Sequence, residues 1–279
     1  MTATQTPQLR IAPMIAFANR DFLISEPASV YHASAGDYLS SHQLADYRKC
    51  PLLYLRRRLG FIEDVDRPAF LFGRAVHTRI LEGSQRFEQE FAVGGPINPT
   101  TGKPFGTNTK AWAEWAESIG KDVLSEKQYE QLMHMTQAVN SHPAASQLLV
   151  DGVAEGVVRT EYCGLPCQIR MDWFGAGIVD LKTCDDLTWF ESDAKKFGYI
   201  YQMAFYRAVL EQASGLQVPV HLVGVEKKEP YRCGVWLIHE DVLRQAQVEN
   251  EAAIERLKQC RATDVWPTGY EDLRVFDLL

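Results

Sequence analysis

Two aspartates and a lysine surround a glycine turn near the middle of the chain. Asp172 precedes the turn, and Asp180 and Lys182 follow it. The apolar residues on both sides predict two short strands, so Asp180 and Lys182 share one face of theirs because strand side chains alternate with period two. Two carboxylates and an ammonium group would then converge beside a hydrophobic strand. A divalent cation placed there turns repulsion between the carboxylates into coordination.

The length of the turn predicts which residues pair across the two strands. Counting outward from the three-residue loop 175–177 pairs Trp173 with Val179 and Asp172 with Asp180. Directly opposed residues have Cβ atoms about 5 Å apart, and like charges at such positions are destabilising. We therefore expect the two aspartates to be retained for a ligand.

Phosphodiester hydrolysis is a reaction that these groups could catalyse. It needs an attacking water, charge neutralisation at phosphorus and support for the leaving oxygen, which one or two Mg²⁺ (or Mn²⁺) ions on Asp172 and Asp180 would supply. Lys182 could orient the water, help to deprotonate it or offset negative charge. An Asp-x-Lys triplet is common by chance, so an ordinary surface hairpin is the alternative.

The surrounding pattern predicts an α/β (α+β) protein with a central mixed sheet flanked by helices and a helical N-terminal elaboration. We expect an irregular lead-in over residues 1–35. A single domain would follow over 36–279, with a helical part at 36–150 and a catalytic sheet core at 151–260. The expected helices are 42–59, 68–82, 109–120, 125–149, 192–213 and 240–260, and the expected strands are 153–161, 166–174, 178–183, 218–226 and 232–239.

Composition places the chain among soluble globular proteins, with 279 residues of which 46% are hydrophobic and 23% charged. It has no apolar run of the roughly 18 residues that a membrane span requires, and its polar N-terminus has no signal-peptide core. We therefore expect a cytoplasmic protein without membrane association. The net charge of −7 argues against nonspecific coating of nucleic acid but allows a nuclease with local basic clusters, at Arg56–Arg58, Lys195–Lys196 and Lys227–Lys228.

Asp172 followed by the segment Ile178-Val-Asp-Leu-Lys-Thr183 resembles the core motif of the PD-(D/E)xK nuclease superfamily. Met171 stands where the motif name has proline, a minor departure. The resemblance implies the PD-(D/E)xK fold. It also implies that Asp172 and Asp180 bind metal and that Lys182 assists the attacking water.

Three further segments resemble RecB-like nucleases. They are the Cys-Pro signature within 39–54, the helix Gly73-Arg-Ala-Val-His77, and the helix Gln202-Met-Ala-Phe-Tyr206. The overall pattern, over about residues 28–240, is most similar to RecE (exonuclease VIII)-type phage recombination nucleases. This resemblance implies that His77 and Glu155 lie near the metal and that Gln202 and Tyr206 line the DNA path.

The RecE resemblance also implies a biological setting. Such enzymes degrade one strand of linear duplex DNA from its 5′ end, leaving a 3′ overhang for a single-strand annealing protein. They often form ring-shaped homo-oligomers, here a trimer or tetramer, and act in the cytoplasm of a bacterial host. Alternatives on the same core are an endonuclease, a 3′-directed nuclease or a non-catalytic DNA-end-binding recombination module.

The sequence also permits expectations about cysteines and arginines. Some RecB-like relatives use the cysteine of Cys-Pro in an iron–sulfur cluster, which requires four thiolates. After the Gln202 helix this chain has only Cys233 and Cys260, so no such cluster is expected with Cys50. The triplet Arg56, Arg57 and Arg58 follows the Cys-Pro segment, and because arginine suits bidentate phosphate contacts we expect some of it to bind DNA.

Overall fold

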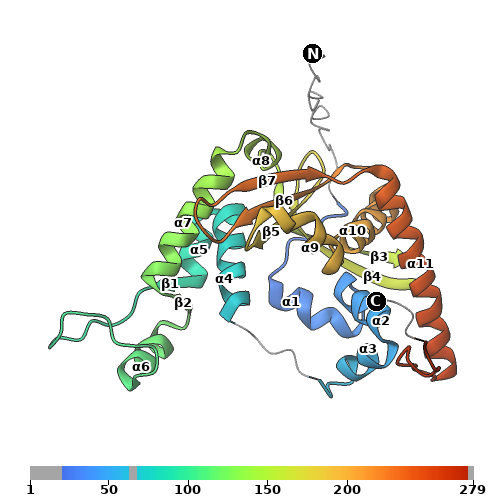
Figure 1. Cartoon of the computed structure of the whole chain (residues 1–279), viewed down its shortest axis with the longest axis horizontal. Coiled ribbons are helices and arrows are strands. Elements are labelled where there is room, and N and C mark those ends of the chain that lie inside the picture. Colours follow the sequence, from blue (N-terminus) through green and yellow to red (C-terminus); the bar gives the residue numbers. More distant parts are fainter. Residues whose placement is uncertain (1–20, 63–67, 276–279) are drawn as a thin grey trace, which may run out of the picture.

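A five-stranded mixed sheet forms the centre of the molecule (Figure 1). The computed structural model describes residues 21–62 and 68–275. The strands lie side by side in chain order: β3 (Val153–Tyr162), β4 (Leu165–Phe174), β5 (Ile178–Cys184), β6 (Val220–Glu226) and β7 (Cys233–Leu237). Only β5 and β6 are parallel neighbours. The predicted mixed sheet is confirmed, with strand ends within two residues of those expected.

The β4–β5 hairpin agrees with the predicted turn but not with the whole predicted pairing. Trp173 pairs with Val179 as expected, yet the ladder between these strands ends there and does not include Asp172 opposite Asp180. The reason is that a side-chain oxygen takes the place of a backbone acceptor. The N–H of Leu181 donates to Oδ2 of Asp172 over 2.8 Å and not to a backbone carbonyl of β4. The two strands therefore separate at the aspartates.

Helix α10 (Tyr199–Ser214) covers one face of the sheet, over β3 and β4. Helices α2 (Ser41–Lys49) and α11 (Glu240–Thr263) pack against α10. Ile178 of β5 joins this first core, whose largest buried side chains include Ile169, Met171, Phe174, Met203, Phe205 and Leu257.

The opposite face of the sheet carries α4 (Pro68–His77), α7 (Glu126–Ser141) and α8 (Pro143–Leu148). Val179 and Leu181 of β5 point into this second core, together with Val76, Leu132, Met135, Val223 and Val225. Because the cores on the two faces take alternate residues of β5, Asp180 and Lys182 are directed toward the α10 side.

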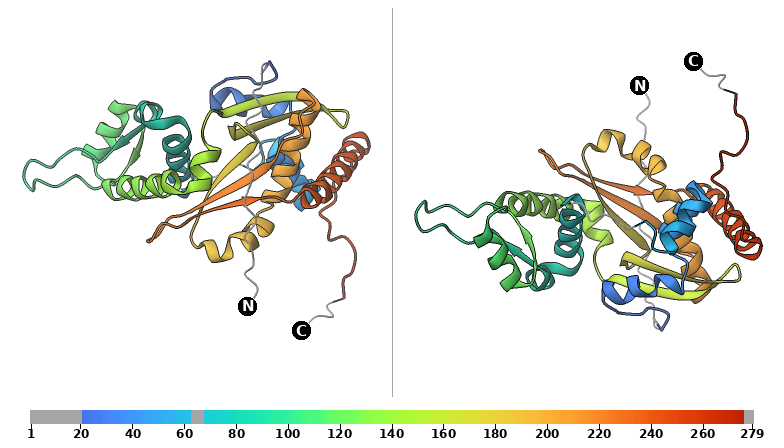
Figure 2. Two further views of the ribbon diagram at one scale, coloured as in Figure 1. Left: turned by 90° about the horizontal axis from the view of Figure 1, so that it is seen from above. Right: turned by 90° about the horizontal axis from the view of Figure 1, so that it is seen from below.

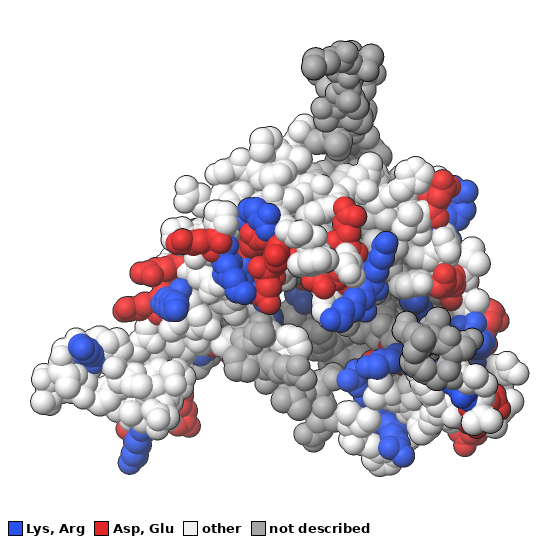
Figure 3. Space-filling view, viewed as in Figure 1, with Lys and Arg blue, Asp and Glu red and all other residues white. Residues whose placement is uncertain are grey.

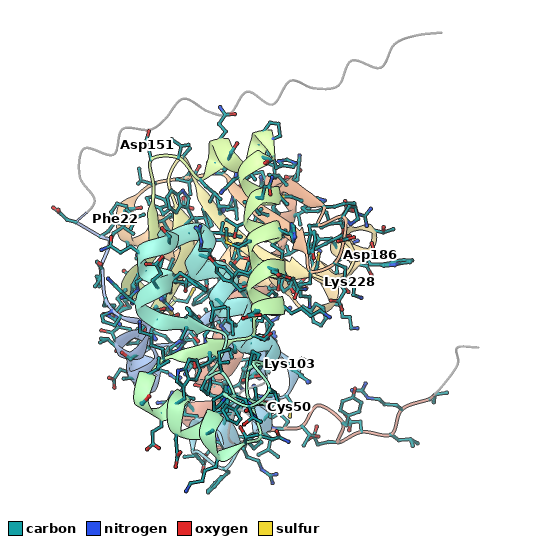
Figure 4. All side chains as sticks on the ribbon, turned by 90° about the vertical axis from the view of Figure 1, so that its left-hand side faces the viewer. Phe22, Cys50, Lys103, Asp151, Asp186 and Lys228 are labelled. Carbon is teal, nitrogen blue, oxygen red and sulfur yellow. The ribbon has the colours of Figure 1, made fainter. Side chains whose placement is uncertain are left out.

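The predicted helical part contains a short projecting arm. It comprises α5 (Gly83–Glu90), β1 (Phe91–Val93), α6 (Lys110–Ile119) and β2 (Asp122–Leu124), and β1 pairs with β2 in parallel. Figure 2 shows this arm to one side of the central sheet. The loop between β1 and α6 reaches farthest, and Figure 4 labels Lys103 on it. The sequence predicted only helices and a loop in this region, which was wrong because it missed β1 and β2. Strands of three residues are too short to show the alternation of apolar and polar residues that identifies a strand.

Three of the predicted helices are interrupted at a proline or glycine. Residues 42–59 divide at Cys50 into α2 and α3 (Pro51–Arg58), and residues 125–149 divide at His142 into α7 and α8. Both breaks precede a proline, which disfavours helical geometry in the residue before it. Residues 192–213 divide at Gly198, whose φ of 74° suits glycine and ends α9 (Phe190–Lys196).

Regular structure occurs within the described part of the N-terminal lead-in. Residues 1–20 of the predicted irregular segment lie outside the described residues, but α1 (Ala28–Ala33) and a 3₁₀ turn, η1 (Ser34–Gly36), follow them, so this part of the prediction was wrong. Ile24 forms an antiparallel bridge with Val157 beside α1. Over the described part of the chain, none of the helices combines the length and the apolar character that a membrane crossing needs.

Candidate active site

A cleft of about 1100 Å³ opens where β4 and β5 separate. Elements from both faces of the sheet reach it, because α4 approaches from the second core and α10 from the first. Side chains that could do chemistry line this cleft: His77, Glu155, Arg170, Asp172, Lys182, Gln202 and Tyr206. Gly73 also lines it, and a Cβ at that position would meet nothing within 4 Å, so the cleft is open beside this residue.

Asp180 is the least satisfied charged group in the site. The residue is only 1% exposed, and neither of its carboxylate oxygens accepts a hydrogen bond within the described part of the chain. Its charge partner is Lys182, whose Nζ lies 2.7 Å from Oδ2 and supplies positive charge. A buried carboxylate without donors is costly unless something else supplies positive charge.

Two residues of α10 contact the ammonium group of Lys182. Its Nζ donates to Oε1 of Gln202 over 3.3 Å and lies 4.8 Å from the ring centroid of Tyr199. Gln202 in turn donates through Nε2 to the hydroxyl of Tyr206 over 3.2 Å. The predicted DNA contacts of Gln202 and Tyr206 thus have a second interpretation, because one amide orients the lysine and Tyr206, only 5% exposed, orients the amide.

A second cluster joins three elements: His77 from the end of α4, Glu155 from β3 and Asp172 from β4. One ligand atom from each lies within 4.8 Å of those of the other two. Nδ1 of His77 is 3.4 Å from Oδ2 of Asp172. A π-helical turn, η2 (Thr78–Glu82), begins directly after His77, and such turns are frequent at functional sites. Of the four predicted metal ligands, His77, Glu155 and Asp172 lie together in this cluster, which does not include Asp180.

Local backbone geometry places Glu155 in the cleft. Its φ of 56° is unusual for a residue that is not glycine, and such strain concentrates at functional sites. Oε2 of Glu155 lies 2.9 Å from Nε of Arg170, which also lines the cleft. Arg170 was missed by the sequence analysis, although it stands two residues before Asp172 and period two would put both on one face.

The pKa values in the site are displaced by burial. Burial raises the pKa of Asp180 to about 6, against the effect of Lys182. Burial and the neighbouring Asp172 raise the pKa of Glu155 to about 8, and burial raises that of Asp172. Burial and Lys182 lower the pKa of His77 to about 4, so its imidazole is neutral at pH 7. Burial opposes the charged form of Lys182, but Asp180 and Asp172 outweigh it and raise the pKa.

This donor set fits a divalent cation. Carboxylate oxygens are the ligands that Mg²⁺ and Mn²⁺ prefer, and the neutral form is the one in which a histidine can bind a metal ion. Asp172, Glu155 and His77 could hold the ion. The orphaned oxygens of Asp180 provide the further negative charge that it would neutralise. The charges of Asp172 and His77 act on the pKa of Asp180, but Asp180 is not one of the three described residues whose ligand atoms lie within 4.8 Å of one another.

The arginine triplet lies apart from these groups and does not line the cleft. Nη1 of Arg57 donates to both carboxylate oxygens of Asp46 over 2.7 Å. Arg58 donates to the hydroxyl of Tyr54 and to the carbonyl of Gly36 over 3.1 and 3.3 Å. Among the described residues, the Arg56 guanidinium has no such partner and is exposed.

The geometry can be set beside known proteins. A sequence profile of the PDDEXK-like domain of unknown function (DUF3799) matches residues 40–277. The chain belongs to this PDDEXK-like family. The predicted superfamily and fold are therefore confirmed, while the RecE type remains a prediction. A comparison with curated proteins found no match.

One solved structure shares the fold of this chain. A candidate exonuclease from Eubacterium rectale is similar with a TM-score of 0.65 and 16% identity, over 92% of this chain and 97% of that one. At this identity the similarity shows the fold alone. A second structure, LHK-Exo in complex with dAMP, gives a TM-score of only 0.27 at 13% identity over 71% of this chain and 98% of that one, and no argument is based on it.

Proposed function

We propose that this protein is a divalent-metal-dependent DNA exonuclease. The observation that carries the proposal is the buried carboxylate of Asp180, which pairs with Lys182 at 2.7 Å and is acted on by the charges of Asp172 and His77. The three-ligand cluster of His77, Glu155 and Asp172 adjoins it. Membership of the PDDEXK-like family and the fold shared with a candidate exonuclease support a nuclease.

The residues have distinct roles in the proposed reaction. Asp172, Asp180, Glu155 and His77 would hold Mg²⁺ or Mn²⁺, which supplies Lewis acidity and offsets charge on the phosphate when bound. Lys182 is an ammonium group in this environment. It therefore acts by orienting the attacking water and by offsetting negative charge in the transition state.

Gln202 fixes the position of that ammonium group. Its amide accepts from Nζ of Lys182 and donates to Tyr206, so it cannot turn freely. Tyr206 is buried at the floor of the cleft, and its pKa is raised well above the usual value by burial. The phenol therefore stays protonated and serves as a fixed hydrogen-bonding group.

The finer proposal follows the RecE resemblance. The enzyme would remove nucleotides from the 5′ end of linear double-stranded DNA and leave a 3′ single-stranded overhang. An annealing protein would then bind the overhang. A ring-shaped homo-oligomer would allow an acidic protein to remain on DNA by enclosing it, and a bacterial host cytoplasm would be its location.

One assay separates the parts of this proposal. Linear duplex labelled at either the 5′ or the 3′ end, and closed circular duplex, are incubated with the protein in Mg²⁺, Mn²⁺ or EDTA. We expect metal-dependent release of 5′ label from linear DNA and none in EDTA. Cleavage of circular DNA would instead indicate an endonuclease, and release of 3′ label the opposite polarity. Metal-dependent DNA binding without any cleavage would refute the enzymatic proposal and favour a non-catalytic end-binding module.

A further inference from the structure

A basic and aromatic surface leads from the catalytic lysine to the outside of the molecule. We call it the α9 corner and define it by Lys195, Lys196, Phe197 and Tyr199, where α9 ends and α10 begins. The two lysines and Phe197 are exposed, and Phe197 retains 58% of its surface accessibility. Figure 3 shows Lys and Arg side chains over α9 on this face. The active-site chemistry described above uses none of these exposed side chains.

Ring contacts make this corner continuous with the active site. Nζ of Lys182 lies 4.8 Å from the ring centroid of Tyr199. The rings of Tyr199 and Phe197 are 5.9 Å apart with 31° between their planes. Nζ of Lys196 lies 5.3 Å from the ring centroid of Phe197. The chain of contacts therefore runs from the reacting centre to an exposed aromatic ring flanked by positive charge.

The backbone explains why a large apolar ring remains on the surface. Phe190 and Ala194 of α9 are buried, whereas Lys195, Lys196 and Phe197 at its end are exposed. Gly198, with φ of 74°, directly follows Phe197 and changes the direction of the chain between α9 and α10. The acidic Glu191 and Asp193 stand in the first turn of α9, where Glu191 accepts a hydrogen bond from Trp236 and the charge of Asp193 acts on Tyr199.

The chemistry of the α9 corner fits single-stranded DNA. An exposed ring can stack on a base only when that base is unpaired, since bases within a duplex cover one another's faces. Lysines beside the ring can contact the phosphates that connect such bases. We propose that the α9 corner binds unpaired nucleotides adjoining the phosphate that is cut. This inference rests on the proposed nuclease function. It adds that the DNA strand next to the phosphate that is cut is single-stranded where it contacts the protein.

Binding can be measured without cleavage, so the test does not depend on catalysis. Fluorescein-labelled (dT)₂₀ and a duplex of 20 base pairs are titrated with protein in EDTA, and affinity is read from fluorescence anisotropy. Phe197→Ala should weaken binding of (dT)₂₀ about tenfold, because stacking contributes on the order of 1–3 kcal/mol per base. Phe197→Trp should retain the affinity. Lys195→Ala/Lys196→Ala should weaken it and flatten its salt dependence.

Matched controls remove equivalent groups elsewhere. Tyr270→Ala deletes a ring that is 73% exposed outside the cleft. Arg244→Ala/Arg256→Ala deletes two charges from the exposed side of α11. Neither should change binding of (dT)₂₀. Because Phe197 is exposed, its replacement should leave the melting temperature unchanged, which excludes unfolding as the cause.

Two results would overturn the inference. One is unchanged (dT)₂₀ affinity in Phe197→Ala, and the other is an equal loss for (dT)₂₀ and duplex, which would indicate a general electrostatic effect. The proposed function fails separately, if wild-type protein releases no nucleotide in Mg²⁺. A protein that binds (dT)₂₀ through Phe197 but never cleaves would keep the binding site and refute the nuclease.

Discussion

The active-site cleft and the arginine triplet of α3 both carry charged groups, but the fold satisfies them to different degrees. In the active site, both oxygens of Asp180 lack hydrogen bonds among the described residues, and burial raises the pKa values of Asp172, Asp180 and Glu155. On α3, Arg57 grips both oxygens of Asp46, and Arg58 is held by Tyr54. The active-site groups are therefore positioned to bind a ligand, whereas Arg57 and Arg58 mainly stabilise the fold.

This contrast has an energetic basis. An exposed ion pair such as Arg57–Asp46 contributes about 0–1 kcal/mol and serves mainly to hold two helices in place. A buried carboxylate without donors is destabilising in the absence of a ligand, and a bound cation offsets that cost. Substitutions in the cleft should therefore affect catalysis and metal binding strongly, and those on α3 should have small effects.

Removal of the lysine in the cleft should have the largest effect. Lys182→Ala should lower the rate of DNA cleavage by about a hundredfold to a thousandfold, because it deletes charge stabilisation in the transition state. Asp180→Ala should be at least as damaging. The measurement is single-turnover release of end label in Mg²⁺.

The control for this prediction is Lys227→Ala. Lys227 also pairs with an aspartate, Asp185, at 2.9 Å, so the change in net charge is the same. Its cleavage rate should match wild type. Equal rates in Lys182→Ala and wild type would contradict the assignment of the catalytic centre.

Metal binding should stabilise the protein in a pH-dependent way. The pKa values of Glu155 and Asp180 are raised to about 8 and about 6, so the metal-free folded state holds protons that the unfolded chain releases. The stability that these groups contribute is present below their ordinary pKa values and is lost as pH rises through about 6 and about 8. A cation competes with the same protons, so the rise in melting temperature on adding Mg²⁺ or Mn²⁺ should grow from pH 5.5 to pH 8.5.

Differential scanning fluorimetry at each pH, with and without metal, checks this expectation. Glu155→Gln should flatten the pH dependence between about 6 and 8, since it removes the group whose pKa is near 8. A metal-induced shift that is constant over the whole range would show that neither carboxylate releases a proton on binding.

The structure explains which parts of this cleft were predictable. The strand 178–183 carries an apolar pattern and a short turn before it, so its position and the Trp173–Val179 pair could be predicted. Asp180 and Lys182 follow from period two on that strand. The separation of β4 from β5 could not, because it depends on a carboxylate of one strand replacing a backbone carbonyl toward the other.

Tertiary packing decided the remaining features. His77 and Glu155 approach Asp172 only because α4 and β3 meet at the open end of the hairpin, and resemblance rather than periodicity indicated them. The left-handed backbone at Glu155 has no local sequence signal such as glycine. By contrast, the helix breaks at Pro51, Pro143 and Gly198 have a local signal in the sequence, because proline and glycine disfavour the interior of a helix. The apolar pattern that continues on both sides of each residue hides this signal.

The role of Gln202 can be resolved by steady-state kinetics. If its amide positions Lys182, Gln202→Ala should lower kcat about tenfold and leave KM nearly unchanged. If instead it contacts DNA, as the resemblance implies, KM should rise while kcat is retained. Tyr206→Phe removes the hydroxyl that accepts from Gln202 and should show the same pattern with a smaller effect, whereas a larger loss than in Gln202→Ala would indicate an independent role for the phenol.

The smallest effects should come from α3 and should divide the triplet. Arg56, exposed and without a partner among the described residues, is free to contact phosphate, so Arg56→Ala should weaken duplex binding a few-fold and reduce the salt slope by about one. Arg57→Ala should leave duplex binding unchanged and lower the free energy of unfolding by less than about 1 kcal/mol. Anisotropy titrations at several salt concentrations and urea unfolding measure the two quantities. Equal losses of affinity in both variants would mean that DNA displaces Asp46 from Arg57, and α3 would then belong with the cleft as a surface arranged for a ligand.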